Sequence, residues 1–234
     1  MMDYIDNIKN PLKDCVINFA KGKNYPLLQQ RLKENFEKFQ FKGDLLLFKD
    51  ESELDSPTHS EHPYAFKVKA FQKAINYGYE NVLWCDSSIN PVKNPSPIFE
   101  YIEKNGHMFF WDGWNCGQWT NDRMLKYFNI TREEAFNIPQ IYACFIGLNL
   151  KNKTSLKFLE EWEKAIPYFS GSWTNKNKTE SNDETCLGHR HDQSAASIIA
   201  YNLGMFDETR YANKWLELNS VATREDVIVL VNGC

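Results

Sequence analysis

The segment NVLWCDSSI, residues 81–89, places apolar residues directly before a carboxylate and two hydroxyls. Residues 82–85 are apolar at every position, which is typical of a strand that is buried on both faces in a parallel sheet. Asp86 follows at the carboxyl end of this strand, where open α/β sheets bind their ligands. A carboxylate there can bind a hard divalent cation that also holds a diphosphate, but Asp and Ser form ordinary turns as well. The tripeptide alone favours the turn, so neighbouring segments must decide its role.

Strand-like and helical segments alternate on both sides of this stretch. Strands are predicted at residues 14–22, 43–50, 81–89, 107–113, 141–150 and 226–233, and helices at residues 24–39, 62–78, 96–106, 155–166 and 191–204. Residues 51–62 form a predicted loop, and residues 120–138 form two helical pieces, the second with a capping box of Thr131 and Glu134. The alternation predicts one α/β domain over residues 1–234, with a central, mainly parallel sheet flanked by helices.

Composition narrows the class of protein. The chain has 234 residues, 42% of them hydrophobic, so it can bury a core, and its net charge of -4 argues against a nucleic-acid-binding surface. No apolar run approaches the roughly 18 residues that span a bilayer. The first residues lack the basic start and apolar segment of a signal peptide, so we expect a soluble, cytoplasmic protein. The scattered cysteines form no CxxC pair, which predicts reduced, buried thiols: Cys15, Cys85, Cys116, Cys144, Cys186 and Cys234.

The helix predicted at residues 62–78 carries a lysine on its apolar side. At about 100° per residue, one apolar arc is formed by Phe66, Ala70, Phe71, Ala74, Ile75 and Tyr77. Lys69 and Lys73 fall on the opposite side, but Lys67 falls in the middle of the arc. An inward lysine needs an anionic partner or a route to water past the helix end. Lys67 therefore either reaches solvent or serves a phosphate or Asp86.

A second group of polar side chains, GHRHDQS at residues 188–194, stands directly before a helix of small and apolar residues. Asp192 is placed to cap that helix. A cap does not need two histidines, an arginine and a glutamine beside it, and this density of titratable groups suits an anionic ligand. His189 or His191 could also complete a metal shell.

The third candidate is HMFFWDGWNCGQW, residues 107–119, which carries three tryptophans among glycines. Aromatic faces with interleaved hydrogen-bonding groups line many sugar sites. A tryptophan-rich core loop is the alternative. The side chains that would bind a sugar acceptor are Trp111, Asp112 and Trp114.

The segment KVKAFQKAINYGYENVLWCDSSI resembles the part of GT-A fold glycosyltransferases that leads into their DXD motif. Further similarities follow in the family's order: NFAKG is similar to the first strand and base-binding loop, IYACFIGLNL to a later strand with a glycine near the acceptor site, and HDQSAASIIAYNLG to the Asp-Gln helix start that faces the donor sugar. One departure is clear, because Ser88 stands where the family usually has its second acid. The resemblance implies a GT-A (Rossmann-like) fold.

The resemblance also implies a role for each matching position. Asp86 would contact a metal ion or the donor ribose, with Ser88 in place of the second acid, and Lys67 would meet the diphosphate. Asp192 would be the catalytic base or would orient the acceptor. Residues implied at the nucleotide and donor are Phe19, Ala20, Lys67, Asp86, Ser87, Ser88 and Gln193, and those at the metal are Asp86, Ser88 and His191.

We therefore expect a glycosyltransferase that moves a sugar from a nucleotide-diphosphate donor, with a UDP-sugar favoured, to a glycan hydroxyl. Mn²⁺ or Mg²⁺ would assist by neutralising the leaving group. The stereochemistry, inverting or retaining, stays open. The alternative is a non-catalytic glycan-binding module on a degenerate transferase fold, for which the missing second acid and the tryptophan loop argue. A hydrolase is a weaker alternative, since no Gly-x-Ser-x-Gly elbow is present.

Overall fold

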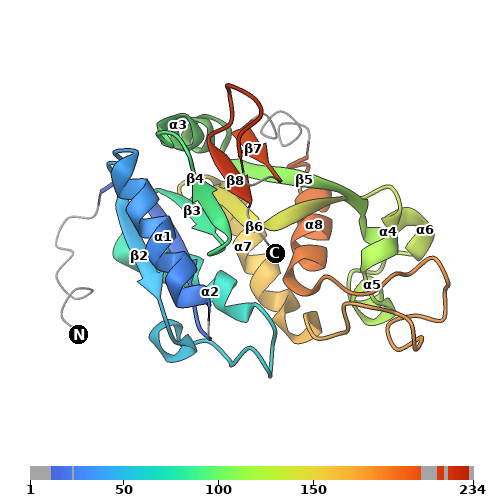
Figure 1. Ribbon diagram of the computed structural model, residues 1–234. Helices are drawn as coiled ribbons and strands as arrows, with labels where there is room; N and C mark the ends of the chain where they lie inside the picture. Colours follow the sequence, from blue (N-terminus) through green and yellow to red (C-terminus); the bar gives the residue numbers. More distant parts are fainter. Residues whose placement is uncertain (1–11, 23, 207–214, 219–220, 232–234) are drawn as a thin grey trace.

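The computed structural model describes residues 12–22, 24–206, 215–218 and 221–231. Its main sheet has the strand order β2-β1-β3-β6-β5 (Figure 1). These strands are β1 (Asp14–Phe19), β2 (Asp44–Phe48), β3 (Asn81–Cys85), β5 (His107–Asn115) and β6 (Pro139–Asn149). β1 pairs in parallel with β2 and β3, whereas β6 is antiparallel to both β3 and β5. Every strand except β6 thus runs in the same direction, which confirms the predicted mainly parallel sheet.

Helices cover both faces of this sheet (Figure 1). One face packs against α1 (Tyr25–Lys38) and α3 (Ser96–Asn105). The other packs against α2 (Ala65–Tyr77), α7 (Lys153–Ala165) and α8 (His191–Asn202). β3 is buried at every position, as its sequence predicted, because its neighbours β1 and β6 and both helical layers enclose it. Its end is therefore held firmly in place.

A small second sheet was not predicted from the sequence. It has the order β4-β8-β7, and its strands are β4 (Ile89–Pro91), β7 (Leu216–Glu217) and β8 (Val229–Val231). Strands this short carry no readable period. The strand predicted at residues 226–233 corresponds to β8, and residues 232 and 233 lie outside the described part of the chain.

Short helices occupy the connections. They are η1 (Glu51–Leu54), α4 (Cys116–Trp119), α5 (Asp122–Tyr127), α6 (Arg132–Ala135) and η2 (Ile166–Tyr168). The predicted capping box of Thr131 and Glu134 is present at the start of α6. Neither η1 nor α4 was predicted from the sequence. Figure 1 shows α4, α5 and α6 grouped together beyond the far end of β5.

The cysteine prediction is confirmed for the described cysteines, each of which is buried and free, while Cys234 lies outside the described residues. No helix in the described ranges combines the length and the apolar character that crossing a membrane requires.

Candidate functional site

A cavity of about 630 Å³ opens beyond the carboxyl ends of β1 and β3. Its lining comes from segments far apart in the sequence: Phe19 after β1, Lys67 in α2, Asp86 after β3, Asp112 in β5 and Asp192 in α8. Because β1 and β3 are parallel neighbours, their ends meet at the same edge of the sheet. The predicted location of the site is therefore where the structure has its large cavity.

Lys67 lies at the charged centre of this cavity. Its Nζ is 3.0 Å from Asp192 Oδ2 and 3.5 Å from Asp86 Oδ1, and it donates a hydrogen bond of 2.9 Å to the backbone oxygen of Ala143. The side chain is 4% exposed, so it does not reach solvent past the helix end. The prediction of an inward lysine with an anionic partner is confirmed, with Asp192 as a partner that the helical wheel did not identify.

Burial and charge set the protonation of this cluster. Burial raises the pKa of Asp192 to about 6, against the opposing effect of the Lys67 charge. Burial alone would lower the pKa of Lys67, but the two carboxylates outweigh it and raise that pKa above its ordinary value. At neutral pH the buried pair is therefore ionised. The ring of Tyr64 lies 5.0 Å from Lys67 Nζ, and its burial raises the pKa of its hydroxyl to about 12.

Asp86 combines the turn and the site that the sequence left as alternatives. Its backbone oxygen accepts a hydrogen bond of 2.9 Å from Ile89 N–H, which closes a turn. Its side chain does not cap that turn, because Oδ1 accepts a hydrogen bond of 2.7 Å from the indole of Trp84. The carboxylate is 31% exposed and lines the cavity. A strand end that is fixed by a turn thus presents a partly open carboxylate.

The serines after Asp86 hold the loop in place. Ser87 exchanges hydrogen bonds with the buried side chain of Asn18 at the end of β1, at 3.2 and 3.4 Å. Arg31 of α1 donates to the backbone oxygens of Ser87 and Ser88, at 3.3 Å each. Both serines line the cavity. Both residues are almost completely buried, so Asp86 is the side chain of this loop that is most open to a ligand.

The proposed metal ligands are brought together only in part. Asp86 and Ser88 line the cavity, but His191 does not. The described residues contain no group of three or more His, Cys, Asp or Glu side chains able to hold a metal ion. Asp86 therefore fits a hard divalent cation as one carboxylate ligand, and the phosphate oxygens of a bound nucleotide would have to complete such a shell.

The two histidines are held by backbone groups. His189 Nδ1 accepts from Asn121 N–H at 3.4 Å, and its Nε2–H donates to the oxygen of Tyr168 at 3.2 Å. Burial lowers the pKa of His189 to about 3, so the ring is neutral and both of its nitrogens are engaged. His191 Nδ1–H donates to the oxygen of Phe169 at 2.7 Å. Arg190, not Asp192, occupies the N-cap position of α8. The N-cap interpretation of Asp192 is wrong, because its carboxylate faces Lys67.

The other end of the cavity is formed by an irregular part of β5. The register between β5 and β6 shifts on either side of Trp111, and Gly113 has a φ of 89°. Asp112 Oδ2 accepts a hydrogen bond of 2.8 Å from the amide of Gln193, and burial raises the pKa of Asp112 to about 6. Asp112, Trp114 and Gln193 line the cavity, whereas Trp111 is exposed outside it.

Arg190 is packed against aromatic rings at this end. Its guanidinium carbon lies 3.9 Å from the ring centre of Trp119 and 4.6 Å from that of Trp173. Each such cation–π contact is favourable by about 0.5–2 kcal/mol. Partial burial lowers the pKa of Arg190, yet an arginine stays charged at neutral pH.

The cavity is lined by one of the two residues that the resemblance implies at the base. Phe19 lines the cavity, stacked on Phe66 with ring centres 4.3 Å apart. Ala20 is 2% exposed and is not part of the lining. Gly147, the glycine of the strand for which the resemblance implies a position near the acceptor, packs against Ile102 of α3 and is not among the lining residues.

Several lining residues were not identified from the sequence: Lys21, Tyr25, Glu51, His59, Tyr64, Tyr142 and Trp173. Most lie in loops, where no period marks an inward side chain. A usable signal existed for Tyr64, since an aromatic residue at the start of the helix that carries Lys67 has to lie at the same end of the sheet.

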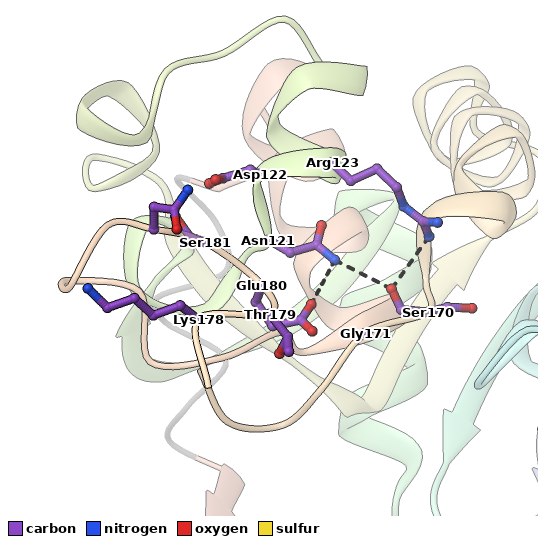
Figure 2. Close-up of a pocket in the computed structure, with 10 residues that line it drawn as sticks. Asn121, Asp122, Arg123, Ser170, Gly171, Lys178, Thr179, Glu180 and Ser181 are labelled. Atoms are coloured by element: carbon purple, nitrogen blue, oxygen red, sulfur yellow. Dashed lines mark hydrogen bonds between the residues drawn. The ribbon is translucent and has the colours of Figure 1, made fainter. Parts of the chain in front are cut away.

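A second cavity, of about 520 Å³, lies between the start of α5 and the loop of residues 170–182 (Figure 2). Its lining is polar and of mixed charge, including Asp122, Arg123, Lys178 and Glu180. The amide of Asn121 is already bound to Glu180, at 3.0 Å. None of the described residues that line this cavity is aromatic, so they offer no stacking surface for a base or sugar.

Comparisons with known proteins agree with this architecture. No protein-family model matches the sequence, and no curated protein does. Among solved structures, the chain is similar to apo mouse xyloside xylosyltransferase 1, with a TM-score of 0.52 and 9% identity over 94% of this chain and 98% of that one. It is also similar to apo WbbM, a bifunctional glycosyltransferase, with a TM-score of 0.56 and 11% identity over 96% of this chain and 46% of that one. The chain thus has the fold of glycosyltransferases, and at this identity the likeness shows the fold alone.

Proposed function

We propose that the protein is a glycosyltransferase that moves a sugar from a nucleoside-diphosphate donor, with a UDP-sugar favoured, to a glycan hydroxyl. The observation that carries this proposal is the cluster of Lys67, Asp86 and Asp192 at the carboxyl ends of parallel strands, inside a large cavity with aromatic walls. The fold shared with glycosyltransferases supports it. In this proposal Lys67 neutralises charge that develops on the leaving diphosphate.

The other residues take roles according to their places in the cavity. Asp192, ionised at neutral pH, accepts the proton of the acceptor hydroxyl or orients it. Gln193, which follows Asp192 in the sequence and donates a hydrogen bond to Asp112, lies beside the transferred sugar. Asp112 and Trp114 bind the acceptor.

Electrostatics favours a divalent cation in this reaction. The cationic side chains that line the cavity are Lys21, Lys67 and Arg190, and the acidic ones are Glu51, Asp86, Asp112 and Asp192. This lining is net negative, so a diphosphate would bind more favourably with Mn²⁺ or Mg²⁺ than alone. Asp86, with Ser88 beside it, would hold that ion, which would supply additional charge neutralisation to the leaving group.

The test is titration with UDP- and GDP-sugars, with and without Mn²⁺, followed by thermal shift and by release of the nucleotide. Binding of one nucleotide and turnover of its sugar would support the proposal, and no shift under any condition would reject it. Asp192→Ala separates catalysis from a glycan-binding module. Loss of turnover with retained binding indicates a transferase, whereas glycan binding without any turnover in the parent protein indicates the module.

A further inference from the structure

Arg190 differs from the other cations of the cavity in forming no direct ion pair with an acidic side chain of the described residues, and Asp112 acts on it only through its charge. Lys21 pairs with Asp50 at 2.7 Å and with Glu51 at 2.5 Å. Lys67 pairs with Asp192 and Asp86. The Arg190 guanidinium instead lies over the rings of Trp119 and Trp173. The cavity therefore contains one arginine that no acidic side chain of the described residues contacts directly.

The aromatic contacts orient this arginine without using its donors. Stacking involves the face of the guanidinium, whereas its N–H groups lie in the plane at its edge. Two indole rings fix the group, so little side-chain freedom is left to lose when a ligand binds. Backbone hydrogen bonds also hold the residue, since its N–H donates to the oxygen of Trp119 at 3.1 Å. Arg190 is thus a preorganised donor for a planar anion, with which it can form two parallel hydrogen bonds.

The surroundings of Arg190 suit a sugar. Trp114 offers an aromatic face, and the joined side chains of Asp112 and Gln193 offer hydrogen bonds to hydroxyls. In the proposed function, the cation that serves the diphosphate of the donor is Lys67, which lies beside Asp86. An anion bound at Arg190 would therefore belong to the sugar end of the ligand.

We propose that Arg190 makes this cavity selective for an acidic sugar, whose carboxylate it binds with two hydrogen bonds. This inference rests on the proposed function, since it names the substrate class of the same cavity. The carboxylate belongs either to the transferred sugar of the donor or to the acceptor, and the two sources call for different probes.

The experiment measures binding by calorimetry in matched pairs. UDP-glucuronic acid against UDP-glucose tests the donor, and methyl glucuronide against methyl glucoside tests the acceptor. In one of the pairs the acidic member should bind about tenfold tighter or more. Arg190→Gln should remove this preference, and Arg190→Lys should keep part of it, because lysine retains the charge but not the bidentate geometry. Arg123→Gln is the matched control, since Arg123 also lies over an aromatic ring, that of Tyr168, but lines the second cavity.

Equal binding of the acidic and neutral members in both pairs overturns the inference, whatever the variants do. It is also overturned if Arg190→Gln weakens the binding of UDP itself as much as that of UDP-glucuronic acid, because Arg190 would then serve the diphosphate. If no nucleotide binds but methyl glucuronide is preferred in an Arg190-dependent way, the transferase proposal fails and the acidic-sugar site stands.

Discussion

The Nζ of Lys67 lies 3.0 Å from Asp192 Oδ2, and both side chains are 4% exposed. This pair joins α2 to α8 across the end of the sheet. A buried ion pair adds little to folding stability compared with well-packed apolar residues in the same place. The loss of one partner, however, leaves an uncompensated charge in a low-dielectric site, which destabilises the fold. The pair therefore couples the fold of the cavity to its chemistry.

Lys67→Met should destabilise the protein by about 3–5 kcal/mol, because Asp192 loses its counter-charge. Adding Asp192→Asn should recover most of that loss, since an amide needs no counter-ion. Urea unfolding measures both. Lys69→Met is the control on the same helix: its pair with Glu163 is partly exposed and should contribute less than about 1 kcal/mol. Equal effects of the two lysine variants would contradict the importance of the buried pair.

Asp192→Asn should lower kcat by about 10²–10⁴ if Asp192 is the base of the proposed transfer. Nucleotide binding should change little, because Lys67 still has Asp86 as a partner. Single-turnover rates and the affinity for UDP are the measurements. A kcat within a few-fold of the parent value would exclude the base role and leave Asp192 with a positioning role.

Asp112 should make stability fall as the pH rises. Burial raises its pKa to about 6, above an unfolded value of about 4, so between these pH values the folded state holds more protons than the unfolded state. This contribution is complete below the unfolded pKa and is lost as the pH rises through the folded one. Asp112→Asn should flatten the dependence of the unfolding free energy on pH in this window.

The matched control is Asp183→Asn. Hydrogen bonds from Thr185 lower the pKa of Asp183, so its removal should change the slope in the opposite direction, and only below the unfolded pKa of about 4. Equal slopes for the parent protein and Asp112→Asn would show that Asp112 titrates alike in both states.

Mn²⁺ should strengthen the binding of UDP, and Asp86→Asn should abolish that increment while the metal-independent affinity stays. Calorimetry with and without EDTA separates the two contributions. His191→Gln tests the histidine among the predicted metal ligands. Because His191 is not part of the cavity lining, we expect Mn²⁺ to strengthen UDP binding in this variant as well. Loss of the increment in His191→Gln, with an intact fold by circular dichroism, would place the histidine in the shell.

Gly147→Ala should destabilise the sheet by about 1–3 kcal/mol through overpacking. A Cβ at this position would meet Ile102 Cδ1 at 2.5 Å. Ile102→Val removes that methyl group, so its cost should be smaller in the Gly147→Ala background than alone. A double-mutant cycle from urea unfolding gives this coupling, and strict additivity would contradict the contact.

Local patterns predicted much of the fold and one part of the site. Residues close together in the sequence determine the apolar run of β3, the helical periods and the end of α2 at Gly78. The inward direction of Lys67 followed from the wheel for the same reason. Strands β4 and β7 and helix α4 are too short for a period to be read, and most of the residues missed in the cavity lie in loops.

The sequence by itself determined an α/β chain with a carboxylate at the end of a buried strand and a lysine turned inward beside it, since burial along one element imposes its own period. Only the tertiary structure decided that Asp192 is the counter-ion of Lys67, that Arg190 lies against Trp119 and Trp173 without a direct ion pair among the described residues, and that His191 lies outside the cavity lining. Those contacts join distant segments, and their geometry depends on how the helices pack across the sheet and on where the loops place their side chains.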